Sequence, residues 1–227
     1  MKNYGRRIAK AGLEIKAIKL NPENPFTWAS GYRMPIYNDN RMFLFYPHYR
    51  NLIRNGFYEL ILKDGIAGHI IAGTATAGIP YAVLLADKLH ERPFIYVRDQ
   101  PKDHGLKNQI EGIDAEKDLD SMYVVLIEDL ISTGGSSAKA VQASWNANGK
   151  CNHCLSIFNY GLEQAAKEFS SLDPKCEVRS LLTYDILLEV AKKTGYLTEE
   201  QIKLLEEWRA DPYNWGERHG FSKVEKK

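Results

Sequence analysis

Two adjacent carboxylates precede a loop of small and hydroxylated residues. Glu128 and Asp129 follow an apolar run, and residues 132–136 read Ser-Thr-Gly-Gly-Ser ahead of a helical pattern. Main-chain N–H groups at a helix N-terminus bind phosphate, and small residues let that backbone approach the ligand closely. The carboxylates repel a phosphate, but they accept hydrogen bonds from neutral hydroxyls or bind a divalent cation. The pattern therefore predicts a ligand with a phosphate and a nearby diol, as in ribose 5-phosphate.

The same loop has a plainer interpretation as a strand-to-helix turn capped by Ser or Thr. Such a turn does not by itself require two adjacent acids and two adjacent glycines. Two better-known nucleotide motifs are excluded, because no Gly-Lys-Ser/Thr follows the glycines and because the glycines are adjacent rather than spaced.

A basic segment of about 24 residues between two predicted strands is the second candidate. Arg98, Lys102, His104 and Lys107 carry its positive charge. Long loops inside compact domains often serve as active-site lids. The alternative is a solvated charge run. Beside a phosphate site, cations that close over the ligand would stabilise negative charge on a leaving group and exclude water.

The elements that must position these residues alternate along the chain. Short apolar runs predict strands at residues 68–72, 93–97, 122–127, 154–158 and 177–182, and helical patterns occupy 79–90 and 136–149. Continuous apolar runs are typical of strands covered on both faces in a parallel sheet, so the sequence predicts an open α/β fold. We also expect a helix from Pro47, a hairpin within 25–38, and a helix from a capping box at Thr198 that Pro212 ends.

Composition narrows the class of protein. The 227 residues are 44% apolar and 26% charged, which is typical of a globular domain. A net charge of +1 gives no reason to expect nucleic acid or an anionic membrane as a partner. Residues 66–86 contain no charged side chain, but Gly, Pro and His interrupt them, so a buried strand, turn and helix is favoured over a membrane span.

The cysteines and the N-terminus predict a cytoplasmic location. Cys151, Cys154 and Cys176 are too few and too unevenly spaced for a secreted disulfide framework, and no apolar leader follows the first residues. A structural zinc site usually has two ligand pairs, and only one close pair is present, so we expect packing thiols.

The acidic pair and its loop resemble the phosphoribosyl pyrophosphate (PRPP) signature of type I phosphoribosyltransferases. Three further stretches are similar to orotate phosphoribosyltransferases in order and spacing, and they read FTWASGYRMPIYNDNR (26–41), IAGTATAGIP (71–80) and YVRDQPKDHGLKNQIEG (96–112). The resemblance implies an α/β type I phosphoribosyltransferase fold, with a mostly parallel central sheet flanked by helices and a small N-terminal hood. Residues 1–227 would form a single domain, with about 1–45 as the hood over the base site and 98–115 as a mobile catalytic loop.

The resemblance also implies a reaction and its partners. The phosphoribosyl group of PRPP would be transferred to orotate, giving orotidine 5′-phosphate and pyrophosphate, in the de novo synthesis of UMP. Mg²⁺ would be bound mainly through PRPP, with no firm protein ligand. A homodimer is expected in which the basic loop acts in the neighbouring subunit's site, and neither nucleic acid nor a membrane is a partner.

Residue roles carry over from the resemblance by position. Lys102 would be the main catalytic cation, and His104 a second contact or proton donor to the leaving group. Glu128 and Asp129 would bind the ribose hydroxyls and help to stabilise an oxocarbenium-like centre. The residues expected to bind PRPP are Arg98, Lys102, His104, Glu128, Asp129, Leu130, Ile131, Ser132, Thr133, Gly134, Gly135, Ser136, Thr74, Ala75 and Thr76. Those expected to bind orotate are Ser30, Arg33, Tyr37, Ser132 and Tyr160.

Two other functions remain open on the sequence. A phosphoribosyltransferase for a purine or another pyrimidine would share the loop after Asp129, but not the hairpin or the basic segment. A ligand-sensing regulator without catalysis usually carries a basic surface or an attached DNA-binding domain, which this composition and length disfavour. The chain also departs from common family patterns at Met34, Ala77 and Asp99.

Overall fold

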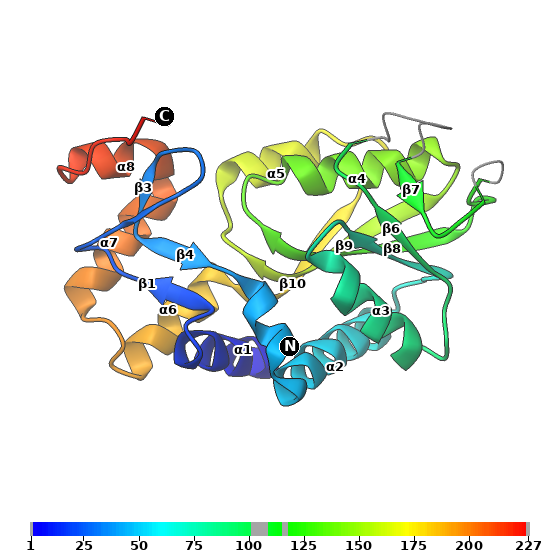
Figure 1. Ribbon diagram of the computed structural model, residues 1–227, viewed down its shortest axis with the longest axis horizontal. Coiled ribbons are helices and arrows are strands. Elements are labelled where there is room, and N and C mark those ends of the chain that lie inside the picture. Colours follow the sequence, from blue (N-terminus) through cyan, green and yellow to red (C-terminus); the bar gives the residue numbers. More distant parts are fainter. Residues whose placement is uncertain (1, 101–108, 115–117, 226–227) are drawn as a thin grey trace.

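A six-stranded sheet forms the centre of the computed structural model, which describes residues 2–100, 109–114 and 118–225 (Figure 1). Its strand order is β10-β9-β8-β5-β6-β7. The strands are β5 (Ile70–Thr74), β6 (Phe94–Val97), β7 (Ile110–Glu111), β8 (Tyr123–Ile131), β9 (Lys150–Asn159) and β10 (Glu177–Thr183). Neighbouring strands are parallel except for the edge strand β7, which runs antiparallel to β6.

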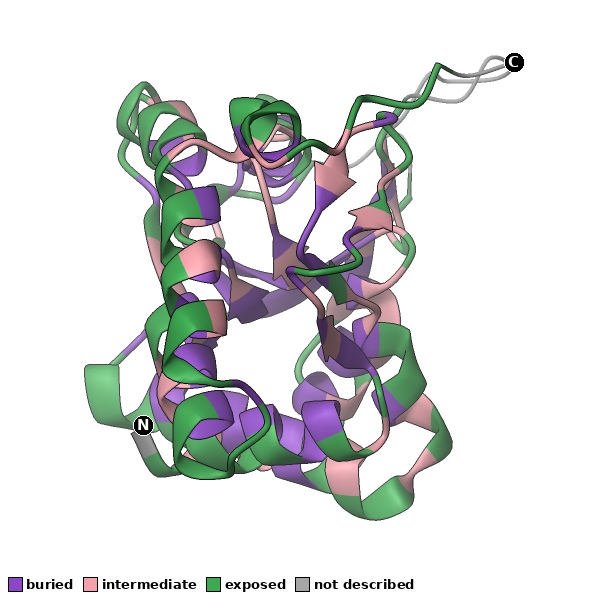
Figure 2. Ribbon diagram, turned by 90° about the vertical axis from the view of Figure 1, so that its left-hand side faces the viewer, coloured by how far each residue is buried: buried purple, intermediate pink, exposed green. Residues whose placement is uncertain are grey.

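Helices cover both faces of this sheet. Figure 1 shows α4 (Gly135–Asn146) and α5 (Glu163–Ser170) on one side, and α1 (Lys2–Glu14), α2 (Pro47–Asp64) and α3 (Gly78–Lys88) on the other. Alternate residues of β8 join two separate apolar clusters, Val125 and Ile127 in one and Val124 and Leu126 in the other. Figure 2 shows the buried strands enclosed by helices whose outer faces are exposed. The apolar runs of the sequence are continuous because both faces of the strands are buried.

A small antiparallel unit, residues 18–38, lies beside the sheet and is called the hairpin unit below. Its strand β1 (Ile18–Leu20) pairs with β4 (Ile36–Asn38), and β2 (Phe26–Thr27) pairs with β3 (Arg33–Met34). The 3₁₀ helix η1 (Asn40–Phe45) leads from β4 to α2. The C-terminal helices α7 (Glu199–Ala210) and α8 (Pro212–Arg218) lie next to this unit in Figure 1. The remaining helix, α6 (Tyr184–Lys193), packs against α1.

The predicted α/β architecture is confirmed, with differences at particular elements. β8 does not end before the acidic pair, because its pairing with β9 continues through Glu128 to Ile131. The capping box at Thr198 is present, and Pro212 opens α8 as well as following α7. Helix α1 packs with α6 and β10, so only the later part of residues 1–45 belongs to the hairpin unit. Within the described ranges, no helix is long and apolar enough to cross a bilayer.

Candidate active site

The carboxylate of Glu128 is buried and held by protein donors. Its side chain is on β8 and the residue is 7% exposed. Thr74 Oγ1 donates to Glu128 Oε1 over 2.7 Å, and Ser137 Oγ donates to Glu128 Oε2 over 2.9 Å. The main-chain N–H of Asp129 also donates to Glu128 Oε1, over 3.0 Å. Glu128 therefore connects β5, β8 and the first turn of α4 around the neighbouring acid.

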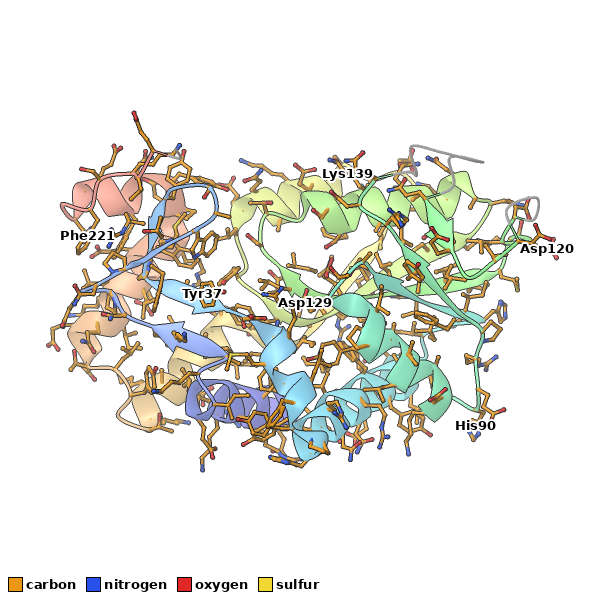
Figure 3. The ribbon with its side chains drawn as sticks, in the orientation of Figure 1. Tyr37, His90, Asp120, Asp129, Lys139 and Phe221 are labelled. Atoms are coloured by element: carbon orange, nitrogen blue, oxygen red, sulfur yellow. The ribbon has the colours of Figure 1, made fainter. Side chains whose placement is uncertain are left out.

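Asp129 is half-buried at the end of β8 that faces the hairpin unit. Burial, followed by the negative charge of Glu128, raises the pKa of the Asp129 carboxyl to about 7. Asn40 Nδ2 donates to the main-chain oxygen of Asp129 over 2.7 Å, and Tyr81 Oη donates to the main-chain oxygen of Asn40 over 2.6 Å. In Figure 3, Asp129 lies at the end of the sheet nearest the hairpin unit, and Tyr37 lies on β4 of that unit. A raised pKa marks a carboxylate whose charge lacks solvation, which suits an acceptor for ligand hydroxyls.

The phosphate loop, residues 132–136, connects β8 to α4. Gly134 has a φ of 85°, and a Cβ there would lie 3.0 Å from Ala165 Cα, so a side chain is disfavoured by both backbone strain and crowding. Gly134 is the N-cap of α4, and it provides no side-chain cap. The first N–H groups of a helix lack intrahelical partners, so this turn can bind an anion. Ser132 and Thr133, which directly precede this turn, are half-buried, and Ser136 in the first turn of α4 is exposed.

A cavity of about 440 Å³ lies between the hairpin unit and the phosphate loop. Four residues that the sequence predicted for the base site line it, namely Ser30, Tyr37, Ser132 and Tyr160. The other lining residues are Thr27, Trp28, Ala29, Asn38, Leu130, Thr133 and Tyr213. Four aromatic side chains in this set offer flat apolar walls, which suit a planar ring.

Arg33 does not line this cavity. Its guanidinium donates to the main-chain oxygen of Pro25 over 2.8 Å and lies 5.8 Å from the ring centroid of Phe221. The expectation that Arg33 faces the base is therefore not met by this geometry. Sequence reasoning also missed Asn38 and Tyr213. Asn38 directly follows Tyr37, so its place in the sequence could have indicated that it lines the base cavity. Tyr213 reaches the cavity only through the tertiary placement of α8, which no local pattern indicates.

Three of the residues predicted for pyrophosphate, Ala75, Thr76 and Arg98, line a second cavity. It measures about 500 Å³ and is lined by Ala75, Thr76, Ile79, Tyr96, Arg98, Asp99 and Gln100. The side chain of Arg98 is 42% exposed, and its Nη1 lies 3.7 Å from Glu111 Oε1. Thr74 differs from Ala75 and Thr76, because its hydroxyl is directed inward to Glu128. Lys102 and His104 lie outside the described residues.

The site offers oxygen ligands for a metal but no protein cage. Across residues 2–100, 109–114 and 118–225, no group of three or more His, Cys, Asp or Glu could hold a metal ion. Oxygen donors such as the Asp129 carboxylate suit Mg²⁺, which commonly uses one or two carboxylates together with substrate phosphates. All three cysteines are free and buried, and burial raises the pKa of Cys154 well above its usual value.

Comparisons with known proteins agree with this geometry. Residues 47–182 match the family model described as phosphoribosyl transferase domain. Orotate phosphoribosyltransferase from Lactococcus lactis subsp. cremoris is 45% identical over 213 residues, covering 94% of this chain and 99% of the relative. The enzyme of that name from Bacteroides fragilis is 46% identical over 215 residues, covering 95% and 98%.

A solved structure agrees as well. The crystal structure of orotate phosphoribosyltransferase from Aeropyrum pernix superposes with a TM-score of 0.68 at 25% identity, covering 84% of this chain and 99% of the other. The mostly parallel sheet with helices on both faces is thus a type I phosphoribosyltransferase fold. The chain belongs to the phosphoribosyltransferases and, among these, to the orotate phosphoribosyltransferase family.

Proposed function

We propose that the chain transfers the phosphoribosyl group of PRPP to orotate, releasing pyrophosphate and forming orotidine 5′-phosphate. Two cavities next to the acidic pair carry this proposal, because Leu130 of the first directly follows Asp129, and Ala75 of the second directly follows Thr74, which is bonded to Glu128. One cavity has aromatic walls for a planar base, and the other carries Arg98 beside the backbone of Ala75 and Thr76. The phosphate loop completes a site with separate places for base, 5-phosphate and pyrophosphate. The names of the curated relatives support the same reaction.

The sugar phosphate would bind with its phosphate at the N-terminus of α4. The N–H groups there, with the hydroxyls of Ser132, Thr133 and Ser136, supply donors to the 5-phosphate. Asp129 would accept hydrogen bonds from the ribose hydroxyls and stabilise positive charge that develops at the anomeric carbon. Glu128 would contribute from behind Asp129, because its oxygens already accept from Thr74 and Ser137.

Departure of pyrophosphate breaks the anomeric C–O bond, and a ring nitrogen of the base forms the new C–N bond. The proton that this nitrogen carried is lost, and the released pyrophosphate can take it up. Negative charge grows on the leaving group during this step, so cations lower the barrier. We assign this role to Arg98, Lys102 and His104, with Lys102 the principal cation of a loop that covers the site. Closing the loop would also exclude water, which competes with the base for the same carbon.

Mg²⁺ is proposed as the metal, bound mainly through PRPP oxygens. It would neutralise pyrophosphate charge when bound. We also propose a cytoplasmic location, which is supported by three free thiols.

A homodimer is proposed, with the basic loop of one subunit completing the site of the other. Phe45 supports an interface on η1, because its side chain is 82% exposed and apolar surface of this kind is commonly covered by a partner. Mixing two inactive variants tests the exchange of loops. If Lys102 acts in the neighbouring site, mixed dimers of Lys102→Ala and Asp129→Asn regain one complete site, and activity returns to roughly a quarter of normal. If the loop acts within its own subunit, mixing restores nothing.

The activity itself is tested by following the absorbance of orotate. Purified protein with orotate, PRPP and Mg²⁺ should lose orotate absorbance, and omission of any one component should stop the loss. Replacement of Lys102 by Ala should reduce turnover by about a hundredfold or more while the thermal unfolding midpoint stays close to normal. No loss of orotate by a folded protein that binds PRPP would contradict the proposed acceptor, and unchanged turnover in Lys102→Ala would contradict that residue's role.

A further inference from the structure

The side-chain amide of Asn38 is buried in the wall of the base cavity and has no hydrogen-bond partner among the described residues. Asn38 is the last residue of β4, and it lines the cavity between the hairpin unit and the phosphate loop. Both Asn38 Oδ1 and Asn38 Nδ2 are inaccessible to solvent, and neither has a hydrogen-bond partner in the part of the chain that the structure describes. Buried polar atoms are nearly always paired in native proteins, so an orphaned donor and acceptor together call for a ligand.

Two other polar atoms of the same wall already have partners. Trp28 Nε1 donates to the main-chain oxygen of Ile36 over 2.8 Å. Tyr213 Oη donates to Gln164 Oε1 over 3.0 Å. These two rings therefore act as walls, and Asn38 contributes what they do not, a donor and an acceptor side by side.

The backbone fixes the position of this amide from both sides. Asn38 pairs with Ile18 across the β1–β4 ladder. Two residues further on, Asn40 is bonded to the main-chain oxygen of Asp129. Both neighbouring segments are anchored, so the backbone at Asn38 loses little conformational entropy when a ligand forms hydrogen bonds to the side chain.

We propose that Asn38 is a specificity-determining residue that reads the imide edge of the acceptor base. A pyrimidine such as orotate presents a ring N–H flanked by two carbonyl oxygens. A carboxamide matches that edge with two parallel hydrogen bonds, the N–H donating to Asn38 Oδ1 and one carbonyl accepting from Asn38 Nδ2. This inference rests on the proposed function, since it concerns the base that the site accepts.

Substitutions at Asn38 test this assignment by steady-state kinetics. The variants are Asn38→Ala, which removes both bonds, and Asn38→Asp, which keeps the shape but cannot donate. Asn24→Ala is the matched control, because Asn24 is exposed on the same unit and does not line the cavity. We expect Asn38→Ala to raise the KM for orotate about tenfold and to change the KM for PRPP by less than about twofold. Asn38→Asp should raise the KM for orotate at least as much, because its carboxylate repels a carbonyl oxygen.

A substrate analogue gives a second readout, and its first measurement uses only the unsubstituted enzyme. Orotate methylated on the ring nitrogen between its two carbonyls cannot donate to Asn38. The unsubstituted enzyme should therefore prefer orotate by about tenfold or more, and this preference should fall toward one in Asn38→Ala. A KM for orotate within about twofold of normal in Asn38→Ala, or an unchanged preference between the two bases, would overturn the assignment. An unsubstituted protein that is inactive on orotate is a different result, which removes the proposed function and this inference with it.

Discussion

The side-chain amide of Asn40 donates to the main-chain oxygen of Asp129 over 2.7 Å, although 89 positions separate the two residues. Asn40 is 1% exposed, and its own main-chain oxygen accepts from Tyr81 Oη. This pair of bonds joins the end of the hairpin unit to the acidic end of β8 and to α3. The wall of the base cavity and Asp129, the acid proposed to bind the sugar, are therefore positioned by one connection.

Removal of the Asn40 amide should weaken both stability and catalysis. Asn40→Ala leaves the buried main-chain oxygen of Asp129 without its donor, which should lower the free energy of unfolding by about 1–3 kcal/mol. We also expect kcat/KM to fall about tenfold, because Asp129 and the base wall lose their fixed relation. Urea unfolding and steady-state kinetics measure the two effects. The surface variant Asn24→Ala is the control, and normal kinetics in Asn40→Ala would show that the connection has no role in positioning.

The hydroxyls that hold Glu128 provide a second prediction. Thr74→Val preserves the shape of the side chain and removes a donor to a carboxylate, and Ser137→Ala removes the other. Each should reduce the free energy of unfolding by about 1–3 kcal/mol and raise the KM for PRPP, since a carboxylate that loses its donors moves toward water. Calorimetry and PRPP titration measure this. Ser171→Ala is the control, because its exposed hydroxyl bonds only to the main chain of α5. Equal effects in that control would contradict the conclusion that the hydrogen bonds to Glu128 contribute more to stability and PRPP binding than an ordinary surface hydrogen bond does.

Much of this site could be predicted from sequence because it depends on local backbone chemistry. Gly134 is required by its positive φ wherever the loop turns into α4, and the acidic pair precedes it in the chain. The parallel strands were also predictable, since their residues are buried on both faces. Strand ends were less predictable, because the pairing of Ile131 with Asn159 depends on a neighbour 28 positions away.

Contacts between distant segments could not be predicted. Arg33 has the residue type expected at an anion site, but Pro25 and Phe221 hold its guanidinium elsewhere. Tyr213 enters the base cavity only because the C-terminal helices pack against the hairpin unit. Glu128 looked equivalent to Asp129 in the sequence, and the two differ because Thr74 and Ser137 reach only Glu128.

The raised pKa of Asp129 predicts opposite effects on stability and activity. The ordinary pKa of an Asp carboxyl is 3.8, and here burial raises it to about 7, so the folded state binds a proton more tightly than the unfolded state between these values. Stability contributed by this group is therefore present at low pH and is lost as pH rises through about 7. Asp129→Asn should be more stable than the normal protein by on the order of 2 kcal/mol at pH 8, with the difference shrinking toward zero near pH 4.

The same variant should lose most of its activity if Asp129 has the proposed role, because the ionised carboxylate is the better acceptor of hydrogen bonds from ribose hydroxyls. We expect kcat to fall about a hundredfold or more. In the normal enzyme, kcat/KM for PRPP should rise with pH through about 7. Urea unfolding of both proteins across pH 4–8 isolates the contribution of Asp129. All other groups are present in both proteins, so their contributions cancel in the difference between the two free energies of unfolding. A stability difference that does not vary with pH would contradict the raised pKa.

Two adjacent glycines provide a matched pair in the phosphate loop. Gly134→Ala forces a side chain into a φ of 85° and against Ala165, so it should cost about 1–3 kcal/mol of stability and weaken PRPP binding. A Cβ at Gly135, the first residue of α4, meets no heavy atom of the described residues within 4 Å. The free energy of unfolding of Gly135→Ala should therefore stay equal or rise by up to about 1 kcal/mol. Denaturation midpoints of the two variants measure these two changes in stability. Equal losses would mean that the loop tolerates no side chain anywhere, rather than only at its left-handed residue.

The C-terminal segment holds the tip of the β2–β3 hairpin, and this predicts an effect on orotate binding far from the chemistry. Val224 N donates to the main-chain oxygen of Gly31 over 2.9 Å, and Lys223 Nζ lies 4.2 Å from the ring centroid of Tyr32. Ser30, directly before Gly31, lines the base cavity. Val224→Pro deletes the donating N–H, whereas Val224→Ala keeps it and serves as the control. We expect Val224→Pro to raise the KM for orotate about threefold to tenfold, with little change in the KM for PRPP.

Truncation after Gly220 extends the same test. It removes Phe221 as well, whose ring stacks on Trp215 and lies under the Arg33 guanidinium. Because both ends of the hairpin then lose support, the KM for orotate should rise further than in Val224→Pro, while the thermal midpoint falls only slightly. We expect the KM for orotate to rise in the order normal protein, Val224→Ala, Val224→Pro, truncated chain. This order would show that the tail keeps the wall of the base cavity in place. A truncated chain with a normal KM for orotate and a lower KM for PRPP would instead make the tail an obstacle to substrate entry, since removing it would then help binding.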